Sequence, residues 1–299
     1  MVSKQMKNAI KILLNRREKN IIKRIEDIRI GDEDFASLIK VAKDVKIEYV
    51  NVNGIPSAWI STPEVDRKYV ILYLHGGGYV SGSIKTHQEL VSRISRVTKA
   101  RALLIEYRLA PEHVFPAALE DTISAYQWLI NTEGIKAKNV IIAGDSVGGG
   151  LVLATLVKLR DSGMVLPSAA VCLSPNTDLT LTSESIRKNA KFDPFVTTYD
   201  LDFNITQYIG NADPRNPLLS PLYADLKGLP PILIQVGTTE ILIDDSIRFA
   251  ERGKTGGTEI ILDIWEDAFH VFQIAAAIGV PESEQAINKI GTFTQRFFV

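Results

Sequence analysis

From residue 69 onward, short apolar strands alternate with helical stretches, and this rhythm most constrains the fold. Runs such as Tyr69–Leu74, Val140–Ala143 and Ala169–Leu173 have no polar face, so each strand must be buried on both sides. Buried strands separated by helices indicate a mostly parallel sheet with helices on both faces. Ahead of them, Lys46–Val52 alternates in polarity, and Asn53-Gly54 is a type I′ turn signal. The leading edge of the sheet is therefore predicted to be an antiparallel hairpin.

The pattern predicts an α/β fold with an eight-stranded sheet. The expected strands are Lys46–Val52, Ala58–Ser61, Tyr69–Leu74, Ala102–Glu106, Val140–Ala143, Ala169–Leu173, Ile232–Val236 and Glu259–Ile264. The helices after the hairpin are expected at about 86–99, 116–131, 146–161, 244–254 and 282–298. A chain of 299 residues buries enough apolar surface to fold without metals or disulfides. The single cysteine, Cys172, permits no internal disulfide and is expected to be a buried structural thiol.

Two segments stand apart from this rhythm. Residues 1–45 are predicted to form two helices broken near Gly31-Asp32, with Leu38 and Val41 continuing the apolar face of the second. Residues from about 178 to 215 form an insertion between two strands, and insertions of this size are usually functional. We expect a catalytic domain over residues 46–299, with the insertion and the N-terminal helices forming a cap. The aromatic residues of the insertion are Phe192, Phe195, Tyr199, Phe203 and Tyr208.

The central motif is Gly144-Asp145-Ser146-Val147-Gly148, a G-x-S-x-G pattern between a predicted strand and a predicted helix. In that setting the serine lies on a cramped turn, and the two glycines let strand and helix pass closely. The hydroxyl of Ser146 then projects above the sheet. The N–H of Val147, at the helix N-terminus, is free to donate to an oxyanion. Ser146 is therefore the predicted nucleophile.

A serine nucleophile needs a base, and on a fold of this kind the chain order is serine, acid, histidine. His270 is the one histidine that follows Ser146, in a short loop after a predicted strand. The acid should follow the strand Ile232–Val236. Glu240 is the first carboxylate there and is the preferred candidate, while Asp244 and Asp245 lie where a helix begins and are alternatives.

A second glycine motif, His75-Gly76-Gly77-Gly78, follows the strand Tyr69–Leu74. Glycines at this position let backbone N–H groups turn toward a ligand, as in an HGGG-type oxyanion loop. We expect three side chains to contact the substrate: Tyr79 beside this loop, and Phe192 and Phe195 in the insertion. The aromatic residues of the insertion favour an apolar acyl pocket, and activity is expected to fall beyond medium-chain esters.

Taken in order, these motifs resemble the hormone-sensitive-lipase-like esterases, the bacterial family IV carboxylesterases of the α/β-hydrolase superfamily. The resemblance extends over nearly the whole chain. It rests on His75–Gly78, Tyr107–His113, Phe115–Ala117, Gly144–Gly150, Asp193–Phe195, Asp244-Asp245 and His270–Phe272. It implies an α/β-hydrolase fold with a helical cap, hydrolysis of short- to medium-chain acyl esters without a cofactor, and a possible homodimer. It further implies that the N–H groups of Gly77, Gly78 and Val147 bind the oxyanion.

The resemblance also assigns supporting residues and reveals two departures. His75, Arg108 and Asp145 match residues that hold the oxyanion and nucleophile loops, which makes His75 structural rather than catalytic. The residue after the nucleophile is usually alanine in this family, and here it is the bulkier Val147. The acid is more often aspartate, although a subgroup similar to this chain carries glutamate at the position of Glu240.

Charge sets bounds on partners. The net charge of −1 gives no general attraction to nucleic acid. The first thirty residues carry nine Lys or Arg against three acids, which gives +6. With Ile21, Ile25 and Ile28 at helical spacing, this segment is interpreted as an amphipathic helix with a solvated basic face, or as a helix that rests on an anionic membrane or lipid substrate. No apolar stretch is long enough for stable membrane insertion, so a cytoplasmic enzyme is expected.

Several alternatives remain open. Fold and triad do not choose among acyl substrates, so an amidase, thioesterase or lactonase would use the same residues. A small-molecule receptor of the same fold is a further alternative, and the retention of His270 argues against it. The cysteine content excludes metal sites built from several thiolates, and no metal site is predicted.

Overall fold

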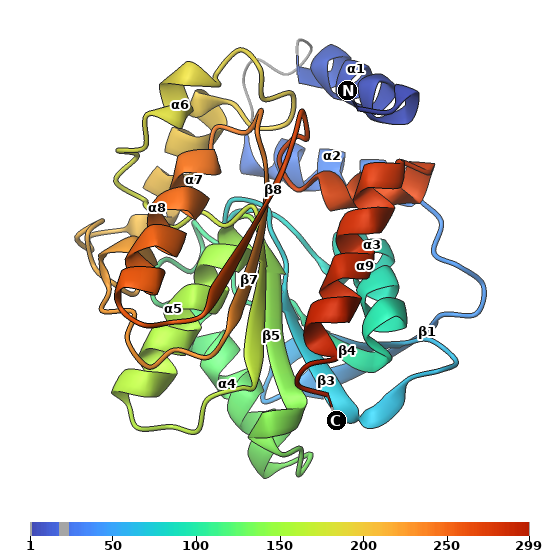
Figure 1. The fold of residues 1–299 in the computed structure, drawn as a ribbon, viewed down its shortest axis with the longest axis vertical. Coiled ribbons are helices and arrows are strands. Elements are labelled where there is room, and N and C mark those ends of the chain that lie inside the picture. The colour runs from blue at the N-terminus through green and yellow to red at the C-terminus, as the bar shows by residue number, and fades with distance from the viewer. Residues whose placement is uncertain (1, 18–23, 299) are drawn as a thin grey trace.

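The computed structural model describes residues 2–17 and 24–298. In this part of the chain eight strands form one sheet in the order β1-β2-β4-β3-β5-β6-β7-β8 (Figure 1). The strands are β1 (Lys46–Val52), β2 (Ile55–Ser61), β3 (Asp66–Leu74), β4 (Ala100–Ile105), β5 (Val140–Asp145), β6 (Ala169–Leu173), β7 (Ile232–Gly237) and β8 (Ile260–Trp265). The predicted eight-stranded, mostly parallel sheet is confirmed, since β3 to β8 pair in parallel.

The antiparallel leading edge is also confirmed. β1 pairs with β2, and β2 pairs with β4, in antiparallel register. Asn53 and Gly54 both have positive φ, at 53° and 92°, as a type I′ turn requires. The turn sets Val52 opposite Ile55 and so fixes the register of the hairpin.

Helices cover both faces of the sheet. The principal helices are α1 (Lys4–Arg17), α2 (Ile25–Ser37), α3 (Ile84–Thr98), α4 (Ala117–Asn131), α5 (Val147–Asp161), α6 (Ser185–Lys188), α7 (Thr198–Ile209), α8 (Ile243–Thr255) and α9 (Pro281–Thr294). Short 3-10 helices are η1 (Ala137–Asn139), η2 (Pro221–Tyr223) and η3 (Phe272–Ile278). α4, α5 and α8 lie on one face, and α3 and α9 lie side by side on the other (Figure 1).

The alternation of side chains along β3 explains this division. Val70 and Leu72 join the apolar core under α4 and α5, while Ile71 and Tyr73 join the core under α3 and α9. A strand that feeds two cores has no polar face, which is why the central strands are apolar throughout.

The N-terminal helices and the insertion lie over one end of the sheet. α1, α2, α6 and α7 are grouped there (Figure 1). The predicted helix break near Gly31-Asp32 is wrong, because α2 runs through both residues. Glycine disfavours a helix interior by about 1 kcal/mol, but tertiary bonds from Asp32 to Ser81 and from Glu33 to Ser83 hold α2 in place. Leu38 does not continue an apolar face, since α2 ends at Ser37 and Leu38 is exposed. Ile21, part of the predicted apolar spacing, lies outside the described residues.

Candidate active site

Ser146 lies on the turn between β5 and α5 with a φ of +55°, a conformation that L-residues rarely adopt. The glycines of the motif are required by close approach to β3. A Cβ on Gly148 would lie 2.2 Å from the carbonyl oxygen of Leu74, and one on Gly144 would lie 2.7 Å from the same oxygen. The sequence pattern therefore reflects how tightly the turn is packed against the neighbouring strand.

The loops after β5, β7 and β8 bring three side chains into line. The hydroxyl Oγ of Ser146 lies 2.9 Å from Nε2 of His270. On the other side of the ring, Nδ1 of His270 lies 3.0 Å from Oε2 of Glu240. The side chains of His270 and Glu240 are almost completely buried, so water does not compete for this contact. The spacing matches a nucleophile, base and orienting acid within hydrogen-bond reach.

The second carboxylate oxygen of Glu240 is also held. Oε1 accepts hydrogen bonds from the Ser174 hydroxyl at 2.8 Å and from the Gly237 N–H at 2.5 Å. Ser174 in turn accepts a bond from the N–H of Val271 at 3.0 Å, next to His270. One hydroxyl thus links Glu240 to the loop that carries His270. Sequence reasoning missed Ser174, because the hydrogen bond crosses 66 residues of chain.

Burial and pairing shift the pKa values of this pair. Burial acts to lower the pKa of His270, but the hydrogen bond and charge of Glu240 outweigh it, and the pKa of His270 is raised. Burial raises the pKa of Glu240, and the hydrogen bond to His270 offsets only part of that effect. The acid therefore favours the protonated imidazole, which is the form created when a serine gives up its proton.

The other two carboxylates after β7 bond elsewhere. Asp245 is buried and accepts bonds from the N–H groups of Thr177 and Asp178, at 2.8 and 2.9 Å. Asp244 accepts a bond from the N–H of Ser185 at 2.8 Å. Burial raises the pKa of Asp245 to about 6. Both residues lie in the first turn of α8; Asp245 binds the segment between β6 and α6, and Asp244 binds the first residue of α6, rather than His270.

The backbone N–H groups of Gly77, Gly78 and Val147 have no hydrogen-bond partner in the described chain. Gly77 and Gly78 have φ values of +113° and +66°. A Cβ on Gly77 would lie 2.3 Å from the carbonyl oxygen of Ser81, so the loop admits only glycine there. Val147 begins α5, where the first N–H groups of a helix have no intrahelical acceptor.

Asp145 connects the two glycine loops. Its carboxylate accepts a bond from the Tyr73 hydroxyl at 2.9 Å and lies 3.3 Å from Nε2 of His87. Burial acts to raise the pKa of Asp145, but the charge and hydrogen bond of His87 outweigh it, so its pKa is lowered. The motifs gave no reason to single out His87, since its partner Asp145 is 58 residues away in sequence.

His75 and Arg108, the two other residues proposed to hold these loops, differ in what they contact. Nδ1 of His75 lies 2.7 Å from the carbonyl oxygen of Gly76, and burial lowers the pKa of His75 to about 3, so its ring is neutral. Arg108 does not reach the glycine loops. Its guanidinium instead binds Asp121 and Glu120, two neighbouring carboxylates near the start of α4.

The predicted substrate residues occupy three different environments. The ring of Phe195 lies 6.1 Å from that of His270. Tyr79 is buried beside the oxyanion loop, with its ring stacked 3.6 Å from Tyr208 of α7. Phe192 is 64% exposed. Only the first two therefore adjoin residues of the candidate site.

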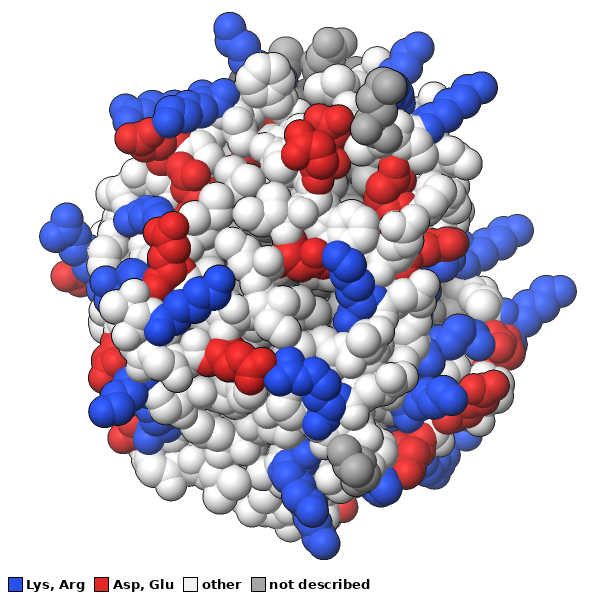
Figure 2. All heavy atoms as spheres, viewed as in Figure 1, with Lys and Arg blue, Asp and Glu red and all other residues white. Residues whose placement is uncertain are grey.

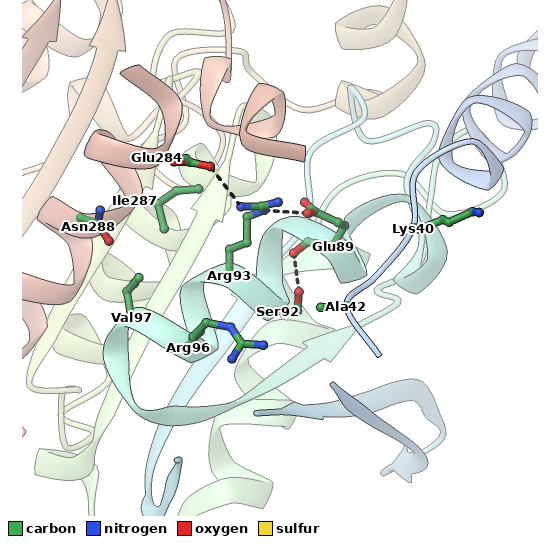
Figure 3. Close-up of a pocket in the computed structure, with 10 residues that line it drawn as sticks. All are labelled: Lys40, Ala42, Glu89, Ser92, Arg93, Arg96, Val97, Glu284, Ile287 and Asn288. Carbon is green, nitrogen blue, oxygen red and sulfur yellow. Dashed lines mark hydrogen bonds and ion pairs between the residues drawn. The ribbon is translucent and has the colours of Figure 1, made fainter. Parts of the chain in front are cut away.

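A separate cavity of about 320 Å³ lies between α3 and α9 (Figure 3). Arg93 pairs with two acids of its lining: Nε of Arg93 lies 2.6 Å from Glu89, and Arg93 also faces Glu284 at 3.9 Å. None of the three aligned side chains lines it. Among the described helices, none has the length and apolar character needed to cross a bilayer.

Known proteins are similar to this chain in sequence. A family model described as the alpha/beta hydrolase fold matches residues 71–274. An acetyl-hydrolase of Streptomyces hygroscopicus is 39% identical over 246 residues, which cover 82% of this chain and 81% of the relative. An esterase of Acinetobacter venetianus is 36% identical, with 83% and 82% covered.

Solved structures agree in both fold and sequence. The crystal structure of an esterase from the bacterial hormone-sensitive lipase family superimposes with a TM-score of 0.96 at 42% identity, and each chain is covered completely. The fold, the family model and the relatives thus agree over most of the chain. The protein belongs to the α/β-hydrolase family and, within it, to the esterases of the bacterial hormone-sensitive lipase family.

Proposed function

We propose that this chain is a serine carboxylesterase that hydrolyses short- to medium-chain acyl esters through an acyl-serine intermediate. The observation that carries the proposal is the continuous line of contacts from Ser146 through His270 to Glu240, with distances of 2.9 and 3.0 Å. Family membership supports the ester-hydrolase class, and this geometry supports the identity of the three residues.

In the first step Ser146 attacks the ester carbonyl carbon while Nε2 of His270 takes the hydroxyl proton. Glu240 holds the ring in the tautomer that carries its proton on Nδ1, and it stabilises the imidazolium that forms. Both carboxylate oxygens of Glu240 already have partners in the protein, so the acid does not need to reorganise during the reaction.

The negative charge that develops on the carbonyl oxygen is stabilised by the N–H groups of Gly77, Gly78 and Val147. Their lack of partners in the described chain supports this role. His270 then gives its proton to the leaving alkoxide, and the acyl group remains on Ser146. Water, activated by His270, attacks the acyl-serine and releases the acid by the reverse of the same steps.

The cap is proposed to consist of residues 1–45 and the insertion at about 178–215. Its support is the position of α2 and α7 against the oxyanion loop. Arg29 of α2 donates to the carbonyl oxygen of Val80 at 2.8 Å, and Tyr208 of α7 stacks on Tyr79. We propose Tyr79 and Phe195 as substrate contacts. Phe192 is also proposed, although its exposure places it at the rim of the cap.

The proposal is tested with p-nitrophenyl esters from acetate to palmitate. The structure of EstE5, 42% identical to this chain, was obtained after soaking with p-nitrophenyl butyrate, which makes butyrate a suitable central substrate. The wild type should be most active on short and medium chains and much weaker on palmitate. Ser146→Ala and His270→Ala should each lower kcat by about 10⁴-fold or more. Substantial esterase activity in Ser146→Ala would contradict the assignment of the nucleophile.

Asp244→Asn is the matched control for a substitution of Glu240, because it removes another carboxylate that follows β7. It should keep nearly full activity, since Asp244 bonds to Ser185 rather than to His270. If the wild type were inert toward all esters but active on amides, thioesters or lactones, the proposed triad would stand. The proposed substrate class would then be wrong.

Two further expectations remain proposals. We propose a cytoplasmic enzyme, to be checked by fractionation of cells that produce it. We also propose a homodimer, to be checked by sedimentation equilibrium, with a monomer at all concentrations as the contradicting result.

A further inference from the structure

An apolar groove lies between α1, the segment after α2 and η3, apart from the aligned side chains. Its walls include Ile12 and Leu13 of α1, Ile39 and Ile278. The groove has a volume of about 60 Å³, which suits a short stretch of hydrocarbon rather than a whole ligand. Ile12 and Ile278 remain 55% and 57% exposed at this groove. Large apolar side chains that gather at one exposed place mark an interaction surface.

The helix on one side of this groove is basic. Lys4, Lys7 and Lys11 are exposed on α1, which contains no acidic residue. Lys7 and Lys11 lie one turn apart on the exposed face, opposite the buried face that contains Met6, Ala9 and Leu13. Basic side chains project from the end of the molecule where α1 lies (Figures 1 and 2).

Basic residues are also adjacent to the groove walls in sequence. Lys11 precedes Ile12, and Lys40 follows Ile39. Lys40 extends away from the paired charges of Arg93 and Glu89 (Figure 3). Its ammonium group is thus directed outward rather than into that ion-pair network.

Two of the five acidic residues on α2 are bound to other segments. Asp32 accepts a hydrogen bond from Ser81 at 2.7 Å, and Glu33 lies 3.2 Å from Nζ of Lys85. Asp34 is exposed and precedes the groove residue Phe35, but no acidic side chain is among the residues that line the described groove. The lining is therefore uncharged, and the exposed lysines of α1 adjoin its aliphatic side chains.

We propose that this surface, formed by α1, residues 38–40 and η3, docks the enzyme onto an anionic lipid bilayer. Lys7, Lys11 and Lys40 lie at the headgroups, and Ile12 and Ile278 enter the boundary with the acyl chains. Cations beside aliphatic side chains are the pattern of helices that lie in a membrane interface. A nucleic-acid surface would instead combine cations with aromatic side chains for stacking.

Docking at this surface has a consequence for the active site. Phe269 lines the groove and immediately precedes His270 in sequence. Contact with lipid would therefore hold the base-bearing loop close to the bilayer, where apolar esters concentrate. The docking itself does not depend on the esterase activity, so it is tested in a catalytically inactive background.

The test is co-sedimentation of Ser146→Ala with phosphatidylcholine vesicles that contain or lack phosphatidylglycerol. We expect binding to the anionic vesicles only, and we expect it to weaken as NaCl is added, because salt screens the attraction. Adding Lys7→Glu and Lys11→Glu should lower partitioning at least about 25-fold, since each cation near the surface contributes roughly fivefold. The matched control is Lys136→Glu with Lys138→Glu, which makes the same charge change at η1 and should bind as before.

The aliphatic part of the proposal has its own variant. Ile12→Ser should reduce vesicle binding several-fold while circular dichroism remains that of the parent, because the side chain is already exposed. Equal binding by the two charge-reversed variants, or equal binding to neutral and anionic vesicles, would overturn the proposal. So would a parent that does not bind vesicles but forms a dimer that Ile12→Ser dissociates, since the groove would then hold a second copy of the chain.

Discussion

At the scale of single residues, Glu240 determines the protonation of its neighbour. In the proposed mechanism the imidazole of His270 accepts the serine proton only when it is neutral, so activity is expected to require a pH above the pKa of His270. Since Glu240 raises that pKa, the acidic limb of the wild-type profile should lie above the ordinary histidine value of about 6.5.

Replacing Glu240 by Gln tests this directly. The charge that raises the pKa of His270 is lost, while the burial that lowers it remains, so the acidic limb of kcat/KM should move to lower pH. The rate itself should fall by about 10³–10⁴-fold, because the amide no longer selects the productive tautomer. The measurement is kcat/KM for p-nitrophenyl butyrate against pH. An acidic midpoint unchanged from the wild type would show that Glu240 does not set the pKa of the base.

The oxyanion loop offers a second test at this scale. Gly78 has a φ of +66°, and a Cβ there would lie 2.2 Å from Nδ2 of Asn204 in α7. Gly78→Ala should therefore lose most activity and destabilise the fold by about 1–3 kcal/mol. In an Asn204→Ala background the contacts with Nδ2 and Cγ are removed, while a milder 2.9 Å contact with Cβ and the backbone strain remain, so the same substitution should cost less. Urea unfolding of the four proteins measures the difference, and equal costs in both backgrounds would exclude the collision.

At the scale of elements, the insertion is attached to the loop that carries the acid. The carboxylate of Asp193 accepts bonds from the N–H groups of Phe195, Val196 and Ile241, at 2.9, 3.1 and 3.0 Å. Ile241 directly follows Glu240 in sequence. The carboxylate that positions Phe195 beside His270 therefore also binds the residue next to Glu240.

Removing this attachment should change selectivity. Asp193→Ala leaves the buried N–H group of Ile241 without this partner, which costs about 1–3 kcal/mol, and it frees Phe195 from its position near His270. We expect a higher KM for butyrate and a shallower fall in rate from short to long esters. Asp202→Ala, an exposed carboxylate on α7, is the control and should leave the chain-length profile unchanged. A profile unaffected by Asp193→Ala would show that the insertion does not limit chain length.

Sequence patterns predicted the elements whose causes are local. The two glycine motifs predicted their turns because only glycine tolerates the close contacts there, and His270 followed from chain order. Ser174, His87 and Asn204 escaped prediction because each acts through a partner on a distant segment. Arg108 was misassigned for the same reason, since its partner Asp121 belongs to a helix whose approach the sequence does not reveal. Gly31 was misplaced as a break because tertiary bonds outweighed local propensity.

At the scale of the whole molecule, the described residues form three apolar clusters that stabilise different parts of the fold. Two lie on the two faces of the sheet and share its strands. The third joins Met6, Ala9 and Leu13 of α1 to Phe269 and Phe272 and lies outside the sheet. α1 is held by this satellite cluster and by the hydrogen bonds of Ser3 to Glu282, so we expect it to open at a lower free energy than the sheet.

Two truncations distinguish these clusters. Met6→Ala removes a fully buried side chain from the third cluster, at a local cost of about 2–5 kcal/mol, and should mainly speed hydrogen exchange in α1. Ile71→Ala makes a similar cavity in the sheet and should lower Tm of the entire protein. Calorimetry with hydrogen exchange measures both effects. An equal fall in Tm for the two variants would show that α1 unfolds only together with the sheet.

The attachment of the insertion to the loop that contains Glu240 bears on how such an enzyme diversifies. Asn189 donates to the carbonyl oxygens of Thr238 and Glu240, and Asp193 binds Ile241. These hydrogen bonds come from one short stretch of the insertion, residues 189–193, and α7 begins after it. Lineages can therefore lengthen, shorten or replace the stretch beyond Asp193 and acquire new ester preferences without disturbing how the acid is held. The same division recommends that stretch as the place to graft foreign sequence when a new substrate range is wanted.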